Sequence, residues 1–408
     1  MIVLCTVIVL SLAHFILSRV YPARCTLQPI AVDTHRSIAD FTAFGANTLT
    51  KRLKLRAQPN SRLFNAFGIV NSFTTTDRLI HVEFLKGAKK IIRGVDWTEL
   101  SQLAGPVLDS TIDHFKSNHS HIPLAALVRV FSFVLVLNVL FSVAPEDIDL
   151  GHAQTAAEAI NRLWLQSKDA KEPVREDQEL LQSSLQELLP DHFPCEVRHN
   201  PINLIIPAFE TLWRVVLLTF IAATNGDMDE QTTLQLSNAV SGGPGCFTSA
   251  EEDETVVLSF AKEGLRLYPP TKRIYRAVPG RYRIWASKVA AADVEACHRD
   301  ERIWGADALQ FRPGRFHSAP LTVKMKQAYM PFSVGKHECP AASGFGDRMI
   351  TVLLLTLVRH FGITAAADLV ELDEISRLAQ SYGNPLPSCR QDMEAWTIQV
   401  EGVDGVAK

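Results

Sequence analysis

A short segment near the C-terminal end of the chain, residues 332–341, combines residue types that can do chemistry. Cys339 is followed by Pro340, which favours the first position of a helix, and then by an apolar run with helical spacing. A thiol at such an N-terminus faces unpaired N–H groups and the positive helix end, which predicts a lowered pKa. Gly335 permits a tight turn or the close approach of a planar ligand, and His337 can donate to an anion. Such a thiolate suits an axial haem ligand; the alternative is a buried structural cysteine.

A second group of candidate residues lies within the predicted helix 202–223. Pro207 lacks an N–H group and therefore frees the carbonyl of Asn203, so the helix should kink or open there. Glu210 and Thr211 follow directly, and an acid beside a hydroxyl can position water and relay protons. A kinked core helix with no catalytic role is the alternative.

Charged pairs in residues 263–276 are candidates for structure or for anion binding. Glu263 and Arg266 are three residues apart, so they share a helix face and can pair. In the extended segment that follows, Arg273 and Arg276 point in opposite directions. For these two arginines, the alternative to anion binding is an exposed basic strand with no ligand.

The N-terminal region predicts a membrane anchor. Residues 1–20 are almost wholly apolar, close to the roughly 20 residues that span a bilayer, and the basic residues follow them. We therefore expect a transmembrane signal-anchor at 1–20, with a cleaved signal peptide as the alternative, and a linker with a shortened N-terminal region at 21–63. The basic cluster of Lys51, Arg52, Lys54 and Arg56 either contacts anionic lipid or is a solvated surface.

Composition favours a large domain with a substantial core. The chain has 408 residues, of which 47% are hydrophobic, and a formal net charge of -3 that gives no reason to expect nucleic acid. Its seven cysteines are dispersed, which favours a reducing compartment. The apolar runs 124–143 and 203–223 contain charges, so we expect core helices. Residues 64–93 predict a loop and then a basic helix capped by Thr76 or Asp77.

Four motifs resemble those of the cytochrome P450 family and follow one another along the chain in the family's order. Residues 332–341 fit its haem-ligand pattern F-x-x-G-x-[HR]-x-C-x-[AG] at every defined position, and residues 311–316 fit F-x-P-x-R-F. Residues 263–266 fit E-x-x-R, whereas residues 207–211 fit [AG]-G-x-[DE]-T only at the acid and the threonine. Residues 71–77 resemble filamentous-fungal members of secondary metabolism. The expected W-x-x-x-R pair is replaced by His81 and Lys86 on the predicted helix 80–93.

The resemblance implies a mainly α fold with small β-sheets, a helical prism behind a single N-terminal transmembrane helix, with the haem-binding monooxygenase domain at 64–408. It implies haem b with Cys339 as the axial thiolate, which favours O–O cleavage. Its implied site residues are the cofactor-binding Phe332, Gly335, His337 and Arg276 (His337 and Arg276 on the propionates), the catalytic Glu210 and Thr211, and a structural triad of Glu263, Arg266 and Arg315.

The resemblance also implies partners and a location. Electrons would come from NADPH through a separate diflavin reductase, docked on Lys324, Lys326, Lys336 and the basic helix. The substrate would be a lipophilic small molecule, and the enzyme would face the cytoplasm from the endoplasmic reticulum membrane. Two alternatives stay open: a haem-thiolate isomerase or dehydratase that needs no external electrons, and a degenerate, haem-free, membrane-anchored binding protein.

Overall fold

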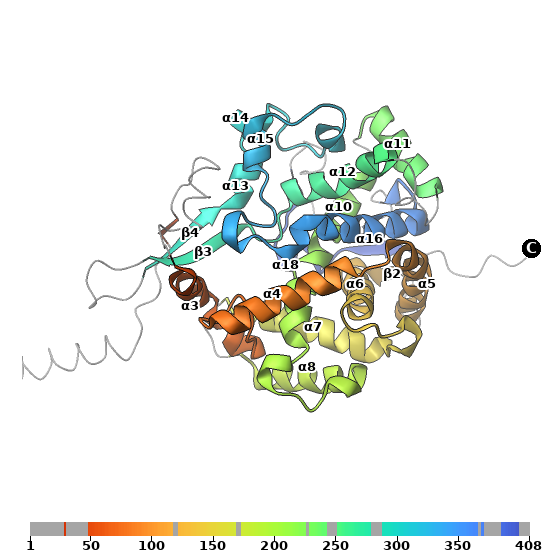
Figure 1. Cartoon of the computed structure of the whole chain (residues 1–408). Helices are drawn as coiled ribbons and strands as arrows, with labels where there is room; N and C mark the ends of the chain where they lie inside the picture. The colour runs from red at the N-terminus through yellow and green to blue at the C-terminus, as the bar shows by residue number, and fades with distance from the viewer. Residues whose placement is uncertain are drawn as a thin grey trace, which may run out of the picture.

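The fold is mainly helical, as predicted, with two small β-sheets (Figure 1). The computed structural model describes residues 28–29, 48–116, 121–168, 173–225, 228–242, 251–278, 288–365, 369–370 and 385–399. The predicted anchor at 1–20 lies outside these residues. The helices are α3 (Leu49–Phe67), α4 (Arg78–Arg93), α5 (Trp97–Lys116), α6 (Leu124–Phe141), α7 (Leu150–Gln166), α8 (Arg175–Leu188), α9 (Ile202–Phe209), α10 (Leu212–Thr224), α11 (Glu230–Ser241), α12 (Glu251–Leu267), α13 (Val294–His298), α14 (Glu301–Trp304), α15 (Val323–Ala328), α16 (Phe345–Phe361) and α18 (Arg390–Met393).

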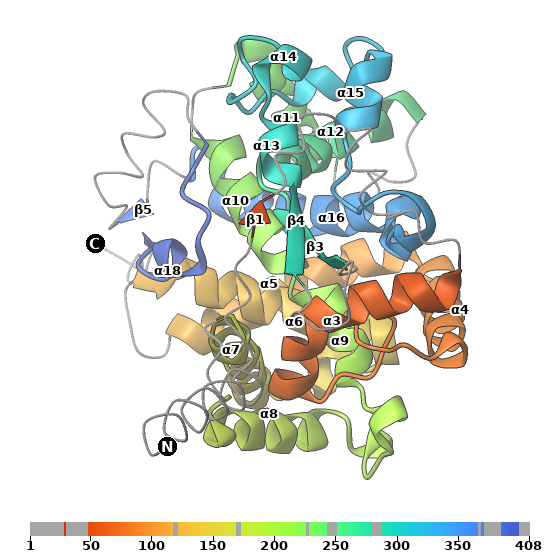
Figure 2. The same ribbon diagram turned by 90° about the vertical axis from the view of Figure 1, so that its left-hand side faces the viewer.

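Each sheet has three short strands. The first has the order β1 (Gln28–Pro29), β4 (Lys288–Asp293), β3 (Arg273–Val278), with β1 parallel and β3 antiparallel to β4. The second has the order β2 (His121–Pro123), β6 (Thr397–Gln399), β5 (Leu369–Val370), and both of its pairings are antiparallel. Figure 2 shows β3 and β4 from the side where α3 lies, and α3 packs against β3.

The core forms where α10, α12 and α16 pack against one another and α10 also contacts α6 (Figure 1). Every residue of α10 is buried, and α6 is buried from Leu124 to Leu137. Helices that are apolar on all sides need such complete cover. By length and hydropathy, Leu124–Phe141 and Val197–Thr224 pass as candidate membrane spans, but most of each is buried within the protein. The prediction of core helices is confirmed.

The buried arginines within these two segments have partners in the C-terminal part of the chain. Arg129 of α6 makes a two-pronged ion pair with Glu394, with N–O distances of 2.5 and 2.9 Å. Arg214 of α10 donates from Nη2 to the carbonyl of Ser388 at 3.0 Å. Both partners belong to the C-terminal segment, which therefore closes the charged side of the core.

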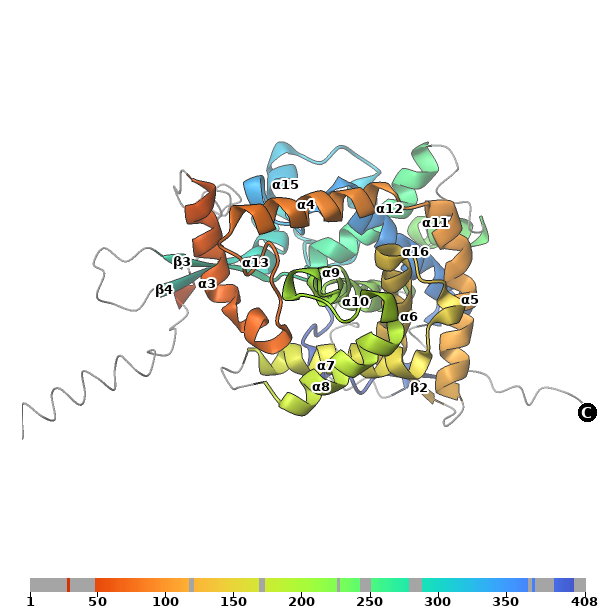
Figure 3. The same ribbon diagram turned by 60° about the horizontal axis from the view of Figure 1, so that its bottom comes forward.

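The segment 202–224 is broken where the proline predicts a kink. α9 ends at Phe209 and α10 begins at Leu212, near the centre of the view in Figure 3. Because Pro207 has no N–H to donate, the carbonyl of Asn203 is free to accept from Asn71 Nδ2 at 2.9 Å. Asn203 Oδ1 in turn accepts from Val70 N at 2.8 Å. The loop between α3 and α4 is thus tied to the opened helix.

The described N-terminal helices correct two expectations. Asp77 caps α4 as predicted and accepts from Leu79 N at 2.7 Å. However, residues 64–67 end helix α3 instead of beginning a loop, and the boundary expected at residue 64 falls inside that helix. Arg56, expected at a lipid or solvent surface, is only 9% exposed. The reason is helical phase, because Leu53, Arg56 and Ala57 share the buried face of α3.

Candidate functional site

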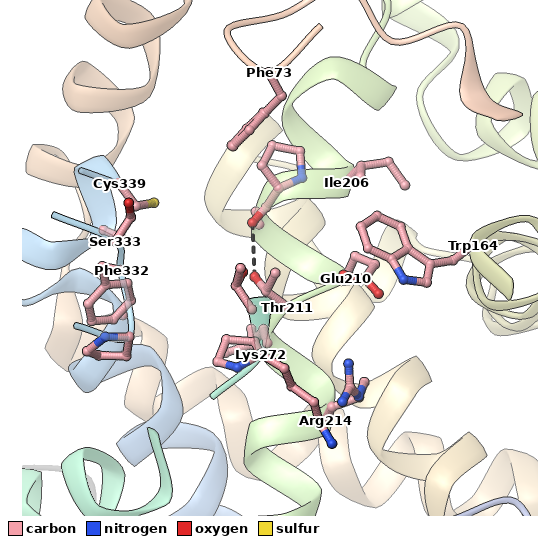
Figure 4. A pocket seen from close by; sticks show the side chains of 18 of the residues that line it. Phe73, Trp164, Ile206, Glu210, Thr211, Arg214, Lys272, Phe332, Ser333 and Cys339 are labelled. Atoms are coloured by element: carbon pink, nitrogen blue, oxygen red, sulfur yellow. Dashed lines mark hydrogen bonds between the residues drawn. The ribbon is translucent and has the colours of Figure 1, made fainter. Parts of the chain in front are cut away.

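A cavity of about 680 Å³ separates the segment that carries Cys339 from the break between α9 and α10. Figure 4 shows the Cys339 sulfur directed into this space from one wall, with Glu210 and Thr211 on the opposite wall. Helices α3, α6, α7 and α16, strand β3 and residues 388–391 also contribute to the lining. The structure thus brings both groups of candidate residues to one cavity.

The Cys339 loop is held by its own backbone. Cys339 N donates to the carbonyl of Phe332 at 2.9 Å, and Gly335 has a φ of 72°, which a residue with a side chain rarely adopts. The short 3₁₀ turn η7 (Pro340–Ser343) follows, with Cys339 as its N-cap and Pro340 at its start. The sulfur is therefore fixed at the cavity wall by the turn geometry.

The expected lowering of the Cys339 pKa is wrong. Burial raises the pKa of the thiol, and this outweighs the opposing effects of a hydrogen bond from Ala341 N–H and of the Arg56 charge. The long helix α16 begins only at Phe345, capped by Gly344, so its N-terminus does not face the sulfur. A group of positive charge at the sulfur would be needed to hold the thiolate at neutral pH.

Phe332 and a glycine of α16 form a matched pair beneath the loop. A Cβ built on Gly346 would collide with the Phe332 ring. Gly346 is buried in the first turn of α16, and Phe332 lines the cavity. Sequence patterns did not point to Gly346, because its role depends on a ring that lies far from it along the chain.

Four basic side chains, Arg56, His81, Arg276 and His337, form a buried cluster at the cavity, which we call the rim cluster. They are 9%, 5%, 5% and 6% exposed, respectively. His81 and His337 approach with ring centroids 6.0 Å apart. Burial, followed by the charges of Arg56 and Arg276, lowers the pKa of His337 to about 3. Both ring nitrogens of His337 are buried without a hydrogen-bond partner among the described residues.

The two arginines of the rim cluster have only neutral partners in the described part of the chain. Arg56 donates from Nη1 to Ser72 Oγ at 3.1 Å, and Arg276 donates from Nη1 to the carbonyl of Tyr275 at 2.8 Å. Burial lowers the pKa of Arg56 to about 9 and of Arg276 to about 10. Four buried basic groups that face no carboxylate form a site for an anion.

The opposite wall holds the acid and the hydroxyl apart. Thr211 Oγ1 donates to the carbonyl of Pro207 at 3.2 Å, across the helix break (Figure 4). Glu210 is 1% exposed, lies toward Trp164 in Figure 4, and forms an ion pair with Arg390. Arg390 was not among the residues that the sequence singled out, because its contact with Glu210 joins distant parts of the chain.

Glu263, Arg266 and Arg315 meet in the core beside the cavity. Arg266 binds Glu263 through two N–O contacts of 2.7 Å, and Arg315 Nε lies 3.4 Å from Glu263 Oε1. Arg266 also donates to the carbonyls of residues 298, 308 and 310, at 2.8, 2.6 and 3.1 Å. The arrangement ties the segment that leads to the Cys339 loop onto α12.

The two strand arginines separate as the alternation predicts. Arg273 is exposed and pairs with Asp293 at 3.0 Å, whereas Arg276 faces the rim cluster. The predicted site residues of β3 and the Cys339 loop therefore converge on one side of the cavity.

Comparisons with known proteins give the class. Residues 255–378 match the family model described as Cytochrome P450. Cytochrome P450 714A2 of Arabidopsis thaliana is 33% identical over 115 residues, covering 25% of this chain and 21% of the relative. Methyltetrahydroprotoberberine 14-monooxygenase of Papaver somniferum is 31% identical over 136 residues, covering 31% and 25%. The chain thus spans between about a fifth and a quarter of these relatives' length.

The fold comparison reaches further along the chain. A crystal structure of a six-coordinated cytochrome P450 from Thermus thermophilus superposes with a TM-score of 0.52 at 18% identity, over 74% of this chain and 78% of that one. At this identity, the likeness shows that most of the chain shares the fold of a cytochrome P450. By sequence, it is residues 255–378 that match the cytochrome P450 family.

Proposed function

We propose that this protein is a haem-thiolate monooxygenase that oxidises a lipophilic small molecule with O₂. The single observation that carries the proposal is the cavity with Cys339 on one wall and Glu210 and Thr211 on the other (Figure 4). The family match over residues 255–378 supports haem with a cysteine ligand, and similar proteins named as a hydroxylase and a monooxygenase support oxygen insertion.

The residues present fit haem. Cys339 places a sulfur at the cavity wall, and Phe332 offers a flat apolar surface beside it. The rim cluster supplies buried positive charge without carboxylates among the described residues, which suits the two propionates. The unpartnered nitrogens of His337 are the clearest sign, since buried polar atoms normally have a partner. In the family pattern, the W-x-x-x-R pair contacts a propionate, and Arg56 and His81 would make that contact here.

Each residue then has a physical task. Haem, when bound, supplies the redox chemistry that activates O₂, and a cysteine ligand favours O–O cleavage. Cys339 would hold the group from one face, and the rim cluster would fix its charged edge. Thr211 would present a hydroxyl to the opposite face, and Glu210 would pass protons when it leaves Arg390. Glu263, Arg266 and Arg315 would maintain the loop and touch no reactant.

The electron donor is part of the same proposal. A separate diflavin reductase would deliver electrons from NADPH at a basic surface. The exposed residues Lys86, Lys89, Lys90 and Arg93 lie on α4, and α4 packs against η7, the turn that follows Cys339. Lys324, Lys326 and Lys336 are also exposed. Opposite charges on a reductase would orient it there.

The cellular setting rests on the sequence alone. The apolar segment at 1–20 supports a single-pass anchor in the endoplasmic reticulum membrane, with the domain from residue 21 onward in the cytoplasm. The segment at 71–77 supports a role in secondary metabolism.

The test is the spectrum of the purified, dithionite-reduced, carbon-monoxide-bound protein beside Cys339→Ala. A strongly red-shifted Soret band that the substitution abolishes is the expected result. A shorter-wavelength band in the wild type would mean that a thiolate does not bind the iron. Absence of any haem band in the wild type would refute the enzyme proposal.

A further inference from the structure

A second group of basic side chains lines the cavity on the side of α7, α10 and α18. It consists of Arg62, Lys168, Arg214 and Arg390, which we call the distal cluster. In Figure 4, Arg214 and Trp164 lie on the side of the cavity away from Cys339. Arg214 therefore lies across the cavity from Cys339.

Neighbouring groups hold the distal cluster in place. Arg62 and Arg390 lie over the ring of Trp164, with the guanidinium carbons 4.8 and 5.6 Å from its centroid. Arg62 donates from Nη1 to Ser167 Oγ at 2.6 Å. Arg214 is 8% exposed, and its Nε is buried without a hydrogen-bond partner among the described residues. A fixed planar donor with an unused N–H is prepared for an acceptor.

Carboxylates do not balance this charge. Among the described residues that line the cavity, Glu210 is the single acid, and it pairs with Arg390. Glu394 pairs with Arg129 outside the lining. Within the described chain, Arg62, Lys168 and Arg214 have no carboxylate within ion-pair distance.

Lys168 shows the same excess of positive charge. Much of its side chain is exposed, yet desolvation at the wall and the charges of Arg390, Arg214 and Arg62 lower its pKa to about 8. An anion placed among these groups would relieve their mutual repulsion.

Apolar side chains make up much of the rest of the cavity wall. They include Leu63, Val136, Leu140, Ile206 and Leu212. A ligand that fills this space therefore needs an apolar body, and it needs an acidic group at one end to meet the distal cluster.

We propose that the substrate is an amphipathic carboxylic acid, bound with its carboxylate on Lys168 and Arg214 and its apolar part directed toward Cys339. The orientation toward Cys339 rests on the proposed function, whereas binding of the acid does not. A carboxylate suits the site because planar guanidinium groups match its two oxygens. Oxidation would then fall on the apolar part, remote from the acid.

The experiment compares dodecanoate with methyl dodecanoate, which has the same apolar chain without the charge. Equilibrium dialysis of the purified full-length protein measures binding of each without any signal from the iron. We expect dodecanoate to bind at least tenfold tighter than the ester. Lys168→Gln and Arg214→Gln should each weaken dodecanoate about tenfold and leave the ester unchanged. Arg175→Gln, at an exposed residue of α8, is the matched control.

Lys168→Gln guards against a folding artefact, because its side chain is largely exposed whereas that of Arg214 is buried. Equal binding of acid and ester by the wild type would overturn the inference, even with an intact red-shifted carbon-monoxide band. A preference for the acid that survives both substitutions would overturn the assignment to the distal cluster. A preference for the acid without a red-shifted band would refute the monooxygenase and support the acid site.

Discussion

Arg56 offers a test in which two measured quantities should move in opposite directions. It stacks on Phe73, with its guanidinium carbon 4.3 Å from the ring centroid, and donates only to Ser72. Burial, and then the charge of Arg276, lowers its pKa to about 9, so it still carries its charge at pH 7. In the protein without haem, this buried charge lowers the free energy of unfolding. In the protein with haem, it would bind a propionate.

The substitution is Arg56→Gln, which keeps a hydrogen-bond donor and removes the charge. A hydrogen bond to a charged group contributes about 1.5–3 kcal/mol, and each 1.4 kcal/mol is a tenfold change, so haem should be lost about 10- to 150-fold faster. The haem-free protein should instead gain free energy of unfolding, because the substitution removes a buried charge that has no carboxylate partner among the described residues.

Transfer of haem to excess apomyoglobin, followed at the Soret band, measures the first quantity. Urea unfolding of the haem-depleted protein measures the second. Arg175→Gln is the control, because Arg175 is an exposed arginine of α8 that does not line the cavity. If Arg56→Gln leaves haem loss unchanged, or destabilises both forms alike, the assignment of the rim cluster to propionates is wrong.

Three further predictions follow from the packing and the charges. Gly346→Ala should lower the thermal unfolding midpoint, because its Cβ collides with the Phe332 ring and overpacking costs about 1–3 kcal/mol; an unchanged midpoint would contradict the close contact. His298 should make the protein acid-sensitive. Burial, and then the charge of Arg266, lowers the His298 pKa to about 3, so the unfolded state binds a proton first as pH falls below 6.5. Stability is then fully present above pH 6.5 and falls by up to about 1.4 kcal/mol per pH unit down to pH 3. Urea unfolding should show a shallower loss in His298→Gln, and equal slopes would count against this reasoning. Charge reversal at Lys324 and Lys326 should reduce reductase-supported turnover and its salt dependence, and an unaltered salt profile would refute the docking surface.

Local patterns predicted the parts of the site that depend on neighbours in sequence. The spacing of Glu263 and Arg266 places both on one helix face. In the structure, Arg266 Nε lies 2.7 Å from Glu263 Oε2. The proline at 207 predicts a break, and α9 ends at Phe209. In both cases the geometry of a single helix turn determines the structure. The local sequence is therefore sufficient to predict the pair and the break.

The parts that escaped prediction depend on contacts between distant segments. Arg390 meets Glu210 only because the C-terminal segment folds back over α10. The sequence analysis assigned Arg56 to the exposed basic cluster because Lys51, Arg52 and Lys54 lie beside it. Its spacing from Leu53 and Ala57 nevertheless places it on the apolar face of α3. The burial of a charge on such a face could have been read as a sign of an anion partner.

The ion pair of Glu210 and Arg390 has a consequence for how the protein is made. Glu210 is 1% exposed, and its partner lies near the last described strand, β6. During synthesis, at about 5–20 residues per second, α9 and α10 emerge seconds before Arg390 does. An unpaired buried carboxylate is costly, so the cavity cannot close around Glu210 until the C-terminal segment has been translated. The nascent chain would therefore keep its interior open until late, and the proposed haem would have an interval in which to enter.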